Sequence, residues 1–167
     1  HPRLCQAFSA PTPSEAKRRR AVTAVGGTTT AGELVDHPLL QRRLATASPI
    51  FSAQIDLHRL PFLRGHTVGG QVIVPGAALL EAALAAAGHG REGATPQLEE
   101  VTLPALLALP AEGALELQTQ LSGGSGESRV EVYGRATGEE TWRVHLTARL
   151  RVDGGEPGTP LDLQAVQ

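Results

Sequence analysis

The segment 76–87 constrains the fold more than any other part of this sequence. It reads Gly-Ala-Ala-Leu-Leu-Glu-Ala-Ala-Leu-Ala-Ala-Ala, a composition that strongly favours a helix. Pro75 lies where a helix can begin, because proline has no N–H to leave unsatisfied in the first turn, and Gly88 is a natural C-terminal stop. Only Glu81 interrupts the apolar character. A helix that is apolar nearly all round is expected to be buried.

Strands are predicted on both sides of this helix, because apolar and polar residues alternate there or β-branched residues gather. The stretches are 51–57 and 71–74 before the helix, and 115–121, 130–134 and 142–152 after it. The glycine-rich run 123–126 is predicted to be a hairpin loop. Two strands, a buried helix and then further antiparallel strands predict an α+β fold. We expect about six strands wrapped around one central helix.

The folded part is predicted to span residues 37–152, between two tethers. Residues 1–36 contain scattered apolar residues broken by proline, glycine and threonine, and residues 153–167 begin with a Gly/Pro-rich run. The sequence starts at His1 without a methionine. We therefore expect it to be a piece of a longer protein.

Composition excludes several classes of partner. The net charge is −2, from 15 basic and 17 acidic residues, which favours neither nucleic acid nor an anionic membrane as a partner. Cys5 is the only cysteine, so the chain forms no internal disulfide and no thiolate metal site, as is typical of a reducing cytoplasm. No apolar run approaches the roughly 20 residues that span a bilayer. We expect a cytoplasmic protein.

One motif, His-x3-Gly-x4-Pro, stands immediately before the predicted helix and is formed by His66, Gly70 and Pro75. It resembles the catalytic motif of the dehydratase domains in modular type I polyketide synthases. Other segments resemble this family in the same order: His37-Pro38-Leu39-Leu40, Pro61-Phe62-Leu63, and Trp142-Arg143-Val144-His145. Between them, residues 98–103 resemble the family's next strand after the helix, and Leu109-Pro110 resembles the exit from that strand. The resemblance covers about residues 37–167, and it implies that residues 153–167 are the linker between two hotdogs.

The resemblance implies a hotdog fold, with this chain as the N-terminal half of a double hotdog. It also implies a hydro-lyase of polyketide and antibiotic biosynthesis, which converts a β-hydroxyacyl thioester to an α,β-unsaturated thioester. His66 is then the expected base, since histidine titrates near neutrality. Gly70, Pro75 and Gly76 are expected to contact the substrate. Gly70 lets the backbone approach the acyl group, and the helix start offers free N–H groups to the thioester carbonyl.

The implied partners are an acyl carrier protein, the second hotdog half and other polyketide synthase domains, and a dimer is expected. No cofactor is expected beyond the phosphopantetheine arm of the carrier protein. No metal is expected either, because no histidine has a partner at metal-ligand spacing. His145 is predicted to be structural, on the polar side of its strand, and His58 and His89 to lie in loops. Trp142 is predicted to be a core or cross-strand aromatic residue.

The catalytic acid is missing from the sequence. In this family it is an aspartate on the second hotdog's helix, in Asp-x3-Gln or Asp-x3-His. Asp162 is followed by glutamine at other spacings, so it is not assigned a role. The chain alone is therefore expected to be an incomplete enzyme.

Two alternatives stay open. One is a homodimeric single-hotdog dehydratase that uses Glu81 of the other subunit. Glu81 lies six residues after Pro75, as the glutamate does in stand-alone fatty-acid dehydratases, although their proline is one residue closer to the histidine. A local partner for Glu81 is the simpler reading. The other alternative is a non-catalytic docking or assembly piece.

Overall fold

The computed structural model describes residues 32–123 and 128–153. Within these residues the elements are β1 (Gly32–Leu34), β2 (Arg42–Leu44), β3 (Ile50–Ile55), the 3-10 helix η1 (Pro61–Gly65), β4 (Thr67–Val68), β5 (Gln71–Val74), α2 (Gly76–Gly88), β6 (Thr95–Thr102), β7 (Leu107–Ala108), β8 (Leu115–Gly123), β9 (Ser128–Ala136) and β10 (Arg143–Asp153).

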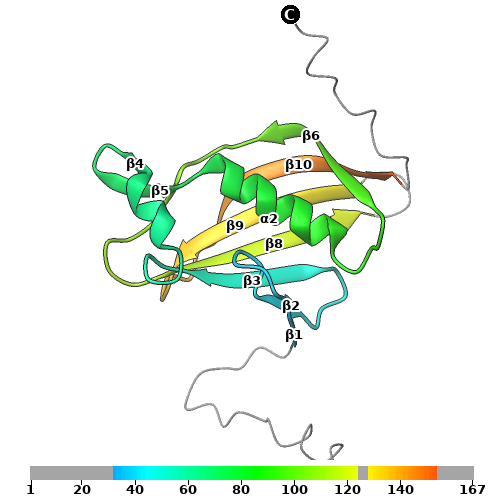
Figure 1. Cartoon of the computed structure of the whole chain (residues 1–167), viewed down its shortest axis with the longest axis horizontal. Coiled ribbons are helices and arrows are strands. Elements are labelled where there is room, and N and C mark those ends of the chain that lie inside the picture. The colour runs from blue at the N-terminus through cyan, green and yellow to red at the C-terminus, as the bar shows by residue number, and fades with distance from the viewer. Residues whose placement is uncertain (1–31, 124–127, 154–167) are drawn as a thin grey trace, which may run out of the picture. The chain divides into compact units, whose positions relative to one another are not determined.

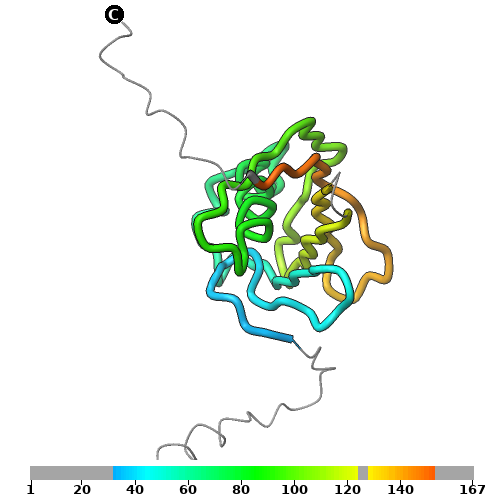
Figure 2. Tube along the Cα trace, turned by 90° about the vertical axis from the view of Figure 1, so that its right-hand side faces the viewer, coloured from blue at the N-terminus to red at the C-terminus, as the bar shows by residue number. Residues whose placement is uncertain are grey.

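A large antiparallel sheet and one long helix form the body of the fold (Figure 1). The seven-stranded sheet has the order β1-β2-β3-β8-β9-β10-β6, and a separate three-stranded sheet has the order β4-β5-β7. The helix α2 contacts β6, β8, β9 and β10, and Figure 2, which looks nearly along the helix, shows the sheet curving around it. The predicted α+β arrangement is confirmed, with more strands than the six expected.

The core lies between α2 and the inward faces of the strands. Alternation works as predicted on β3, where Phe51, Ala53 and Ile55 are buried, and the same pattern continues on β8 and β9. The buried helix residues are Leu79, Ala82, Ala83, Ala86 and Ala87. Because alanine is small, the helix can lie close to the sheet and exclude water over a long line of contact.

The helix is buried along one face and not all round. Ala77 and Glu81 are exposed, and Leu80 and Leu84 are only partly buried. The expectation of complete burial is therefore wrong. An Ala/Leu composition fills both faces of a helix equally well, so it does not distinguish a covered face from an open one.

Element boundaries differ slightly from the predictions. The helix runs one residue further than expected, to Gly88, and the left-handed glycine beyond it is Gly90, at φ 71°. Pro75 is the N-cap of the helix and not its first residue. Strand β1 lies inside the predicted tether 1–36, so the fold begins before residue 37. The rest of that tether, most of the loop 123–126 and most of the linker 153–167 lie outside the described residues.

Strand β10 contains a bulge that the sequence pattern did not reveal. Opposite β9, the register passes from Val144 to Leu146 while β9 advances by only one residue, so His145 is the extra residue. His145 and Leu146 are consequently both buried, at 3% and 0% exposure. The prediction that His145 lies on the polar side of its strand is wrong, because a bulge re-aims one side chain without ending the strand.

Candidate active site

The hairpin β4–β5 carries the candidate base. Val68 pairs with Gln71, which leaves Gly69 and Gly70 as a two-residue turn. Their φ angles are +59° and +80°, the pattern of a type I′ turn, which non-glycine residues enter only with strain. A side chain at either position would meet nothing within 4 Å. The glycines are therefore required by the backbone conformation, and the space beside the turn is open.

The His66 ring is oriented by the neighbouring strand. Its Nδ1 lies 2.8 Å from the carbonyl oxygen of Ile73, and the Ile73 N–H donates to the His66 carbonyl at 2.9 Å. Since a carbonyl only accepts, Nδ1 carries the ring proton when the imidazole is neutral, and Nε2 keeps the lone pair. The side chain is exposed. This tautomer is the one that lets Nε2 accept a proton from a bound molecule.

Strand β5 is fixed in turn by β7. Ile73 pairs with Ala108 and Val74 pairs with Leu107, while the Leu109 N–H donates to the Val72 carbonyl at 2.8 Å. The carbonyl that orients His66 thus belongs to the central strand of the small sheet. The histidine itself lies just before the edge strand β4.

The start of α2 follows β5 directly. The Pro75 carbonyl accepts from the N–H groups of Ala78 and Leu79, at 2.9 and 3.4 Å. No side chain caps the helix, and its first turn holds no acidic residue. The N–H groups of Gly76 and Ala77 precede these bonds and have no partner inside the helix. The helix start is therefore suited to an oxygen that carries negative charge.

Four of the predicted site residues lie on one continuous unit. His66 and Gly70 belong to the hairpin, and Pro75 and Gly76 are the cap and first residue of the helix that follows it. Gly76 also allows close packing, since a Cβ there would lie 3.0 Å from Cδ1 of Leu103. Leu103 belongs to the connection 103–106 between β6 and β7.

Glu81 has a partner of its own. Its Oε1 lies 3.5 Å from Nε2 of His37. The Nδ1 of His37 accepts from the Leu39 N–H at 3.2 Å, so the proton of a neutral ring sits on Nε2, facing the carboxylate. Glu81 is exposed, and its contact joins the segment between β1 and β2 to the helix.

His145 is a buried polar residue that the sequence pattern placed wrongly. Its Nδ1 lies 3.1 Å from the carbonyl oxygen of Ala105. Burial lowers the pKa of His145; the bond to the Ala105 carbonyl acts in the opposite direction and the nearby Arg143 in the same one. The hint in the sequence is that Gly134, opposite on β9, leaves room for this ring: a Cβ there would lie 3.2 Å from Cδ2 of His145.

Other predicted features fall outside this unit. Trp142 lies just before β10 and is partly buried, with the guanidinium of Arg135 on β9 4.4 Å from the centre of its ring. His89 caps the end of α2 and meets the Phe51 ring edge-on at 5.2 Å. Within residues 32–123 and 128–153, no group of three His, Cys, Asp or Glu side chains is placed to hold a metal.

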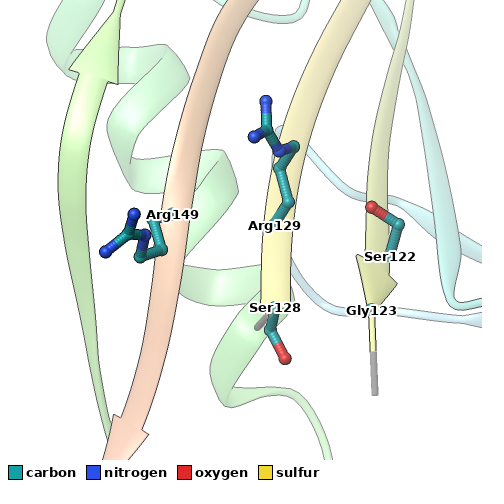
Figure 3. A pocket seen from close by; sticks show the side chains of 5 residues that line it. All are labelled: Ser122, Gly123, Ser128, Arg129 and Arg149. Atoms are coloured by element: carbon teal, nitrogen blue, oxygen red, sulfur yellow. The ribbon is translucent and has the colours of Figure 1, made fainter. Parts of the chain in front are cut away.

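A surface hollow of about 200 Å³ lies at the other end of the large sheet (Figure 3). It is lined by Ser122, Gly123, Ser128, Arg129 and Arg149. The guanidinium groups of Arg129 and Arg149 point in different directions, and that of Arg149 pairs with Glu100 at 3.0 Å. These two guanidinium groups do not converge on a common point.

Comparisons with known proteins agree with this architecture. The dehydratase domain from the terminal module of the rifamycin polyketide synthase superposes with a TM-score of 0.70 at 29% identity, over 81% of this chain and 49% of that one. The dehydratase domain from the CurK module of curacin polyketide synthase gives 0.68 at 25% identity, over 78% and 47%. One helix wrapped by a curved antiparallel sheet, together with these structural neighbours, shows a hotdog fold.

The sequence comparisons identify the family within this fold class. The profile of the polyketide synthase dehydratase domain matches residues 37–135. Polyketide synthase GfsB of Streptomyces halstedii is 36% identical over 141 residues, which are 77% of this chain and 2% of that protein. The spectinabilin polyketide synthase system protein NorA' of Streptomyces orinoci is 37% identical over 157 residues, 86% of this chain and 4% of that protein. The chain belongs to the polyketide synthase dehydratase domain family.

The matched proteins are much longer than this chain. It spans only a few per cent of the curated synthases and about half of the solved dehydratase chains. Among the described residues, no helix has the length and apolar character needed to cross a membrane.

Proposed function

We propose that this chain is the histidine-bearing half of a dehydratase that removes water from a β-hydroxyacyl thioester. The observation that supports this most is the His66–Ile73 contact of 2.8 Å, which leaves Nε2 as the free basic nitrogen of an exposed ring. Family membership supports this reaction class, and the ring geometry supports a role for His66 in the reaction.

The reaction needs a base, an acid and a site for the carbonyl. Nε2 of His66 removes the proton from the α-carbon, and the electrons of that C–H bond form the new double bond. The bond from the β-carbon to oxygen breaks, and an acid protonates the departing hydroxyl to give water. Backbone N–H groups at Gly70 and at the start of α2 stabilise the charge that develops on the thioester oxygen.

The acid is proposed to come from a second hotdog. The coverage of about half in both solved dehydratases supports this proposal. Strand β6 also forms one edge of the large sheet, and Val101 on it and Leu103 just after it are 41% and 49% exposed. An uncovered strand edge beside exposed apolar side chains is a surface that native proteins normally cover.

The substrate is proposed to arrive on the phosphopantetheine arm of an acyl carrier protein, within a synthase whose other domains act before and after this step. No other cofactor enters the reaction. The relatives named above are polyketide synthases, which supports a carrier-bound polyketide intermediate as substrate.

The base assignment is tested by replacing His66 in the complete protein that carries this chain. His66→Gln should lower turnover of a β-hydroxyacyl pantetheine thioester roughly 100-fold to 10,000-fold, measured as unsaturated product by mass spectrometry. His58→Gln, at another exposed histidine, is the matched control and should keep full activity. Undiminished turnover in His66→Gln would refute the assignment.

The homodimer alternative has a separate test. Glu81 of a second copy would be the acid, so residues 1–167 alone would convert the thioester and lose this activity in Glu81→Gln. We expect no turnover from residues 1–167, because the acid is proposed to come from the second hotdog and Glu81 is an exposed carboxylate 3.5 Å from Nε2 of His37. Turnover that depends on Glu81 would favour the homodimer.

A further inference from the structure

Two histidines far apart in the sequence are joined through one short strand. His145 on β10 contacts the Ala105 carbonyl in the connection 103–106, which leads directly into β7. β7 pairs with β5, and the Ile73 carbonyl of β5 orients the ring of His66. Both histidines therefore use Nδ1 to hold a backbone carbonyl, and the two carbonyls lie on segments that pair with each other or are next to each other in the chain.

We propose that His145 is a positioning residue for His66: it anchors the connection 103–106 and strand β7, which hold β5 and the catalytic hairpin in place. This inference rests on the proposed function only in its kinetic consequence. The structural coupling stands on the contacts alone.

The packing around His145 supports this role. The side chain is 3% exposed, and its ring lies against Gly134 on β9. A Cβ at Gly134 would also lie 2.7 Å from Cδ1 of Leu107, the β7 residue that pairs with Val74. Gly134 on β9 thus leaves room both for the His145 ring and for Leu107 on β7. A ring packed in this way has little freedom to move away from Ala105.

The same connection also reaches the helix start. Leu103 packs against Gly76, the first residue of α2, and Leu106 is 67% exposed on the same connection. The segment held by His145 therefore touches both parts of the candidate site, the hairpin through β7 and the helix through Leu103. Small displacements of groups that position a base can lower a rate substantially.

A buried hydrophobic residue at the bulge would fill the space as well as histidine does. A hydrophobic residue cannot supply the Nδ1–H donor, so the carbonyl of the partly buried Ala105 would lose this hydrogen bond. Two variants can therefore test the hydrogen-bond donor of His145 separately from the volume of its side chain. His145→Phe removes the donor and keeps a ring, whereas His145→Asn keeps an N–H close to the position of Nδ1.

The test compares these two variants in the complete protein, with His89→Phe as a control at the other end of α2. His145→Phe should lower kcat roughly tenfold to a hundredfold with KM nearly unchanged. It should also speed amide hydrogen exchange in residues 66–76, measured by mass spectrometry. His145→Asn should restore most of both properties, and His89→Phe should change neither.

The exchange measurement keeps this proposal separate from the reaction itself. If the wild-type protein catalyses no dehydration, the proposed function fails and exchange in residues 66–76 still decides the coupling. If His145→Phe does not fold, Gly134→Ala perturbs the same packing from β9, because its Cβ would press on Leu107 and on the His145 ring. A folded His145→Phe, or a folded Gly134→Ala, with unchanged exchange in residues 66–76 would overturn the proposal.

Discussion

The helix-and-sheet body and the β4–β5 hairpin are stabilised in different ways. The body combines a helix face of alanine and leucine with long strands whose inward side chains are almost fully buried. The hairpin has two-residue and four-residue strands, an exposed histidine and a turn that depends on two glycines. Burial stabilises the first region throughout, whereas the second combines a glycine turn and a few hydrogen bonds with only two buried side chains, Ile73 and Val74 on β5. A change in either region should therefore be felt in a different measurement.

The largest expected effect is in the body. Phe51→Ala removes one of the largest fully buried side chains and should lower the free energy of unfolding by about 3–5 kcal/mol. Phe62→Ala is the matched control, because Phe62 is 67% exposed, and it should change stability little. Urea denaturation measures both. Equal losses in the two variants would contradict the core described above.

The hairpin should respond to backbone changes. Gly69→Ala places a Cβ on a residue with φ +59° and should destabilise the turn by about 1–2 kcal/mol. Gly69→Asn instead creates Asn-Gly, a favoured type I′ sequence, and should be tolerated better. Amide exchange in residues 66–74 should increase in the alanine variant alone, with a smaller fall in melting temperature than in Phe51→Ala. A loss of melting temperature as large as in Phe51→Ala would show that the two regions unfold together.

The buried His145 should make the stability of the protein depend on pH. Because burial lowers the pKa of His145 from its ordinary value of 6.5, the unfolded chain binds this proton more readily than the folded chain. The contribution to stability is complete above pH 6.5 and is lost as the pH falls from there through the folded pKa. His145→Asn should weaken this dependence in melting curves between pH 7 and pH 5. An identical pH dependence in the variant would assign the effect to other groups.

The smallest effect is expected on the outer face of the sheet. Arg135 pairs with Glu116 at 2.6 Å and covers the Trp142 ring, but all three side chains remain partly exposed. Arg135→Lys keeps the charge and loses the planar fork, so it should change stability by no more than about 1 kcal/mol. Thermal melts at low and high salt measure this, and the difference from wild type should shrink at high salt. A loss comparable to Phe51→Ala would mean that the outer face carries part of the core's role.

Much of the body was predictable because its periodicity is local. Alternation located β3, β8, β9 and β10, and residue propensity located α2 to within one residue. The short strands β1, β2, β4 and β7 were missed, since two or three residues carry no period and are defined by the strands they pair with. The bulge at His145 was missed for a similar reason: it appears only in the register against β9.

The candidate site also has a part that the sequence indicates and a part that it does not. The motif supplied the candidate residues His66, Gly70, Pro75 and Gly76, and the structure has them on the β4–β5 hairpin and the start of α2. Their partners were not predictable, because they are backbone carbonyls and residues far away in the sequence. Nothing around residue 81 indicates His37, which is 44 positions earlier. Nothing around residue 145 indicates Ala105, which is 40 positions earlier.

The bulge on β10 has a consequence for how this strand tolerates insertion and deletion. An extra residue is accommodated at one point, and the ladder with β9 resumes in register from Leu146 onward. Deleting His145 would restore a regular strand and leave the pairing beyond it intact, while removing the contact to Ala105 in the same step. Deleting this one residue would therefore leave a regular strand that no longer contacts the segment leading to the hairpin.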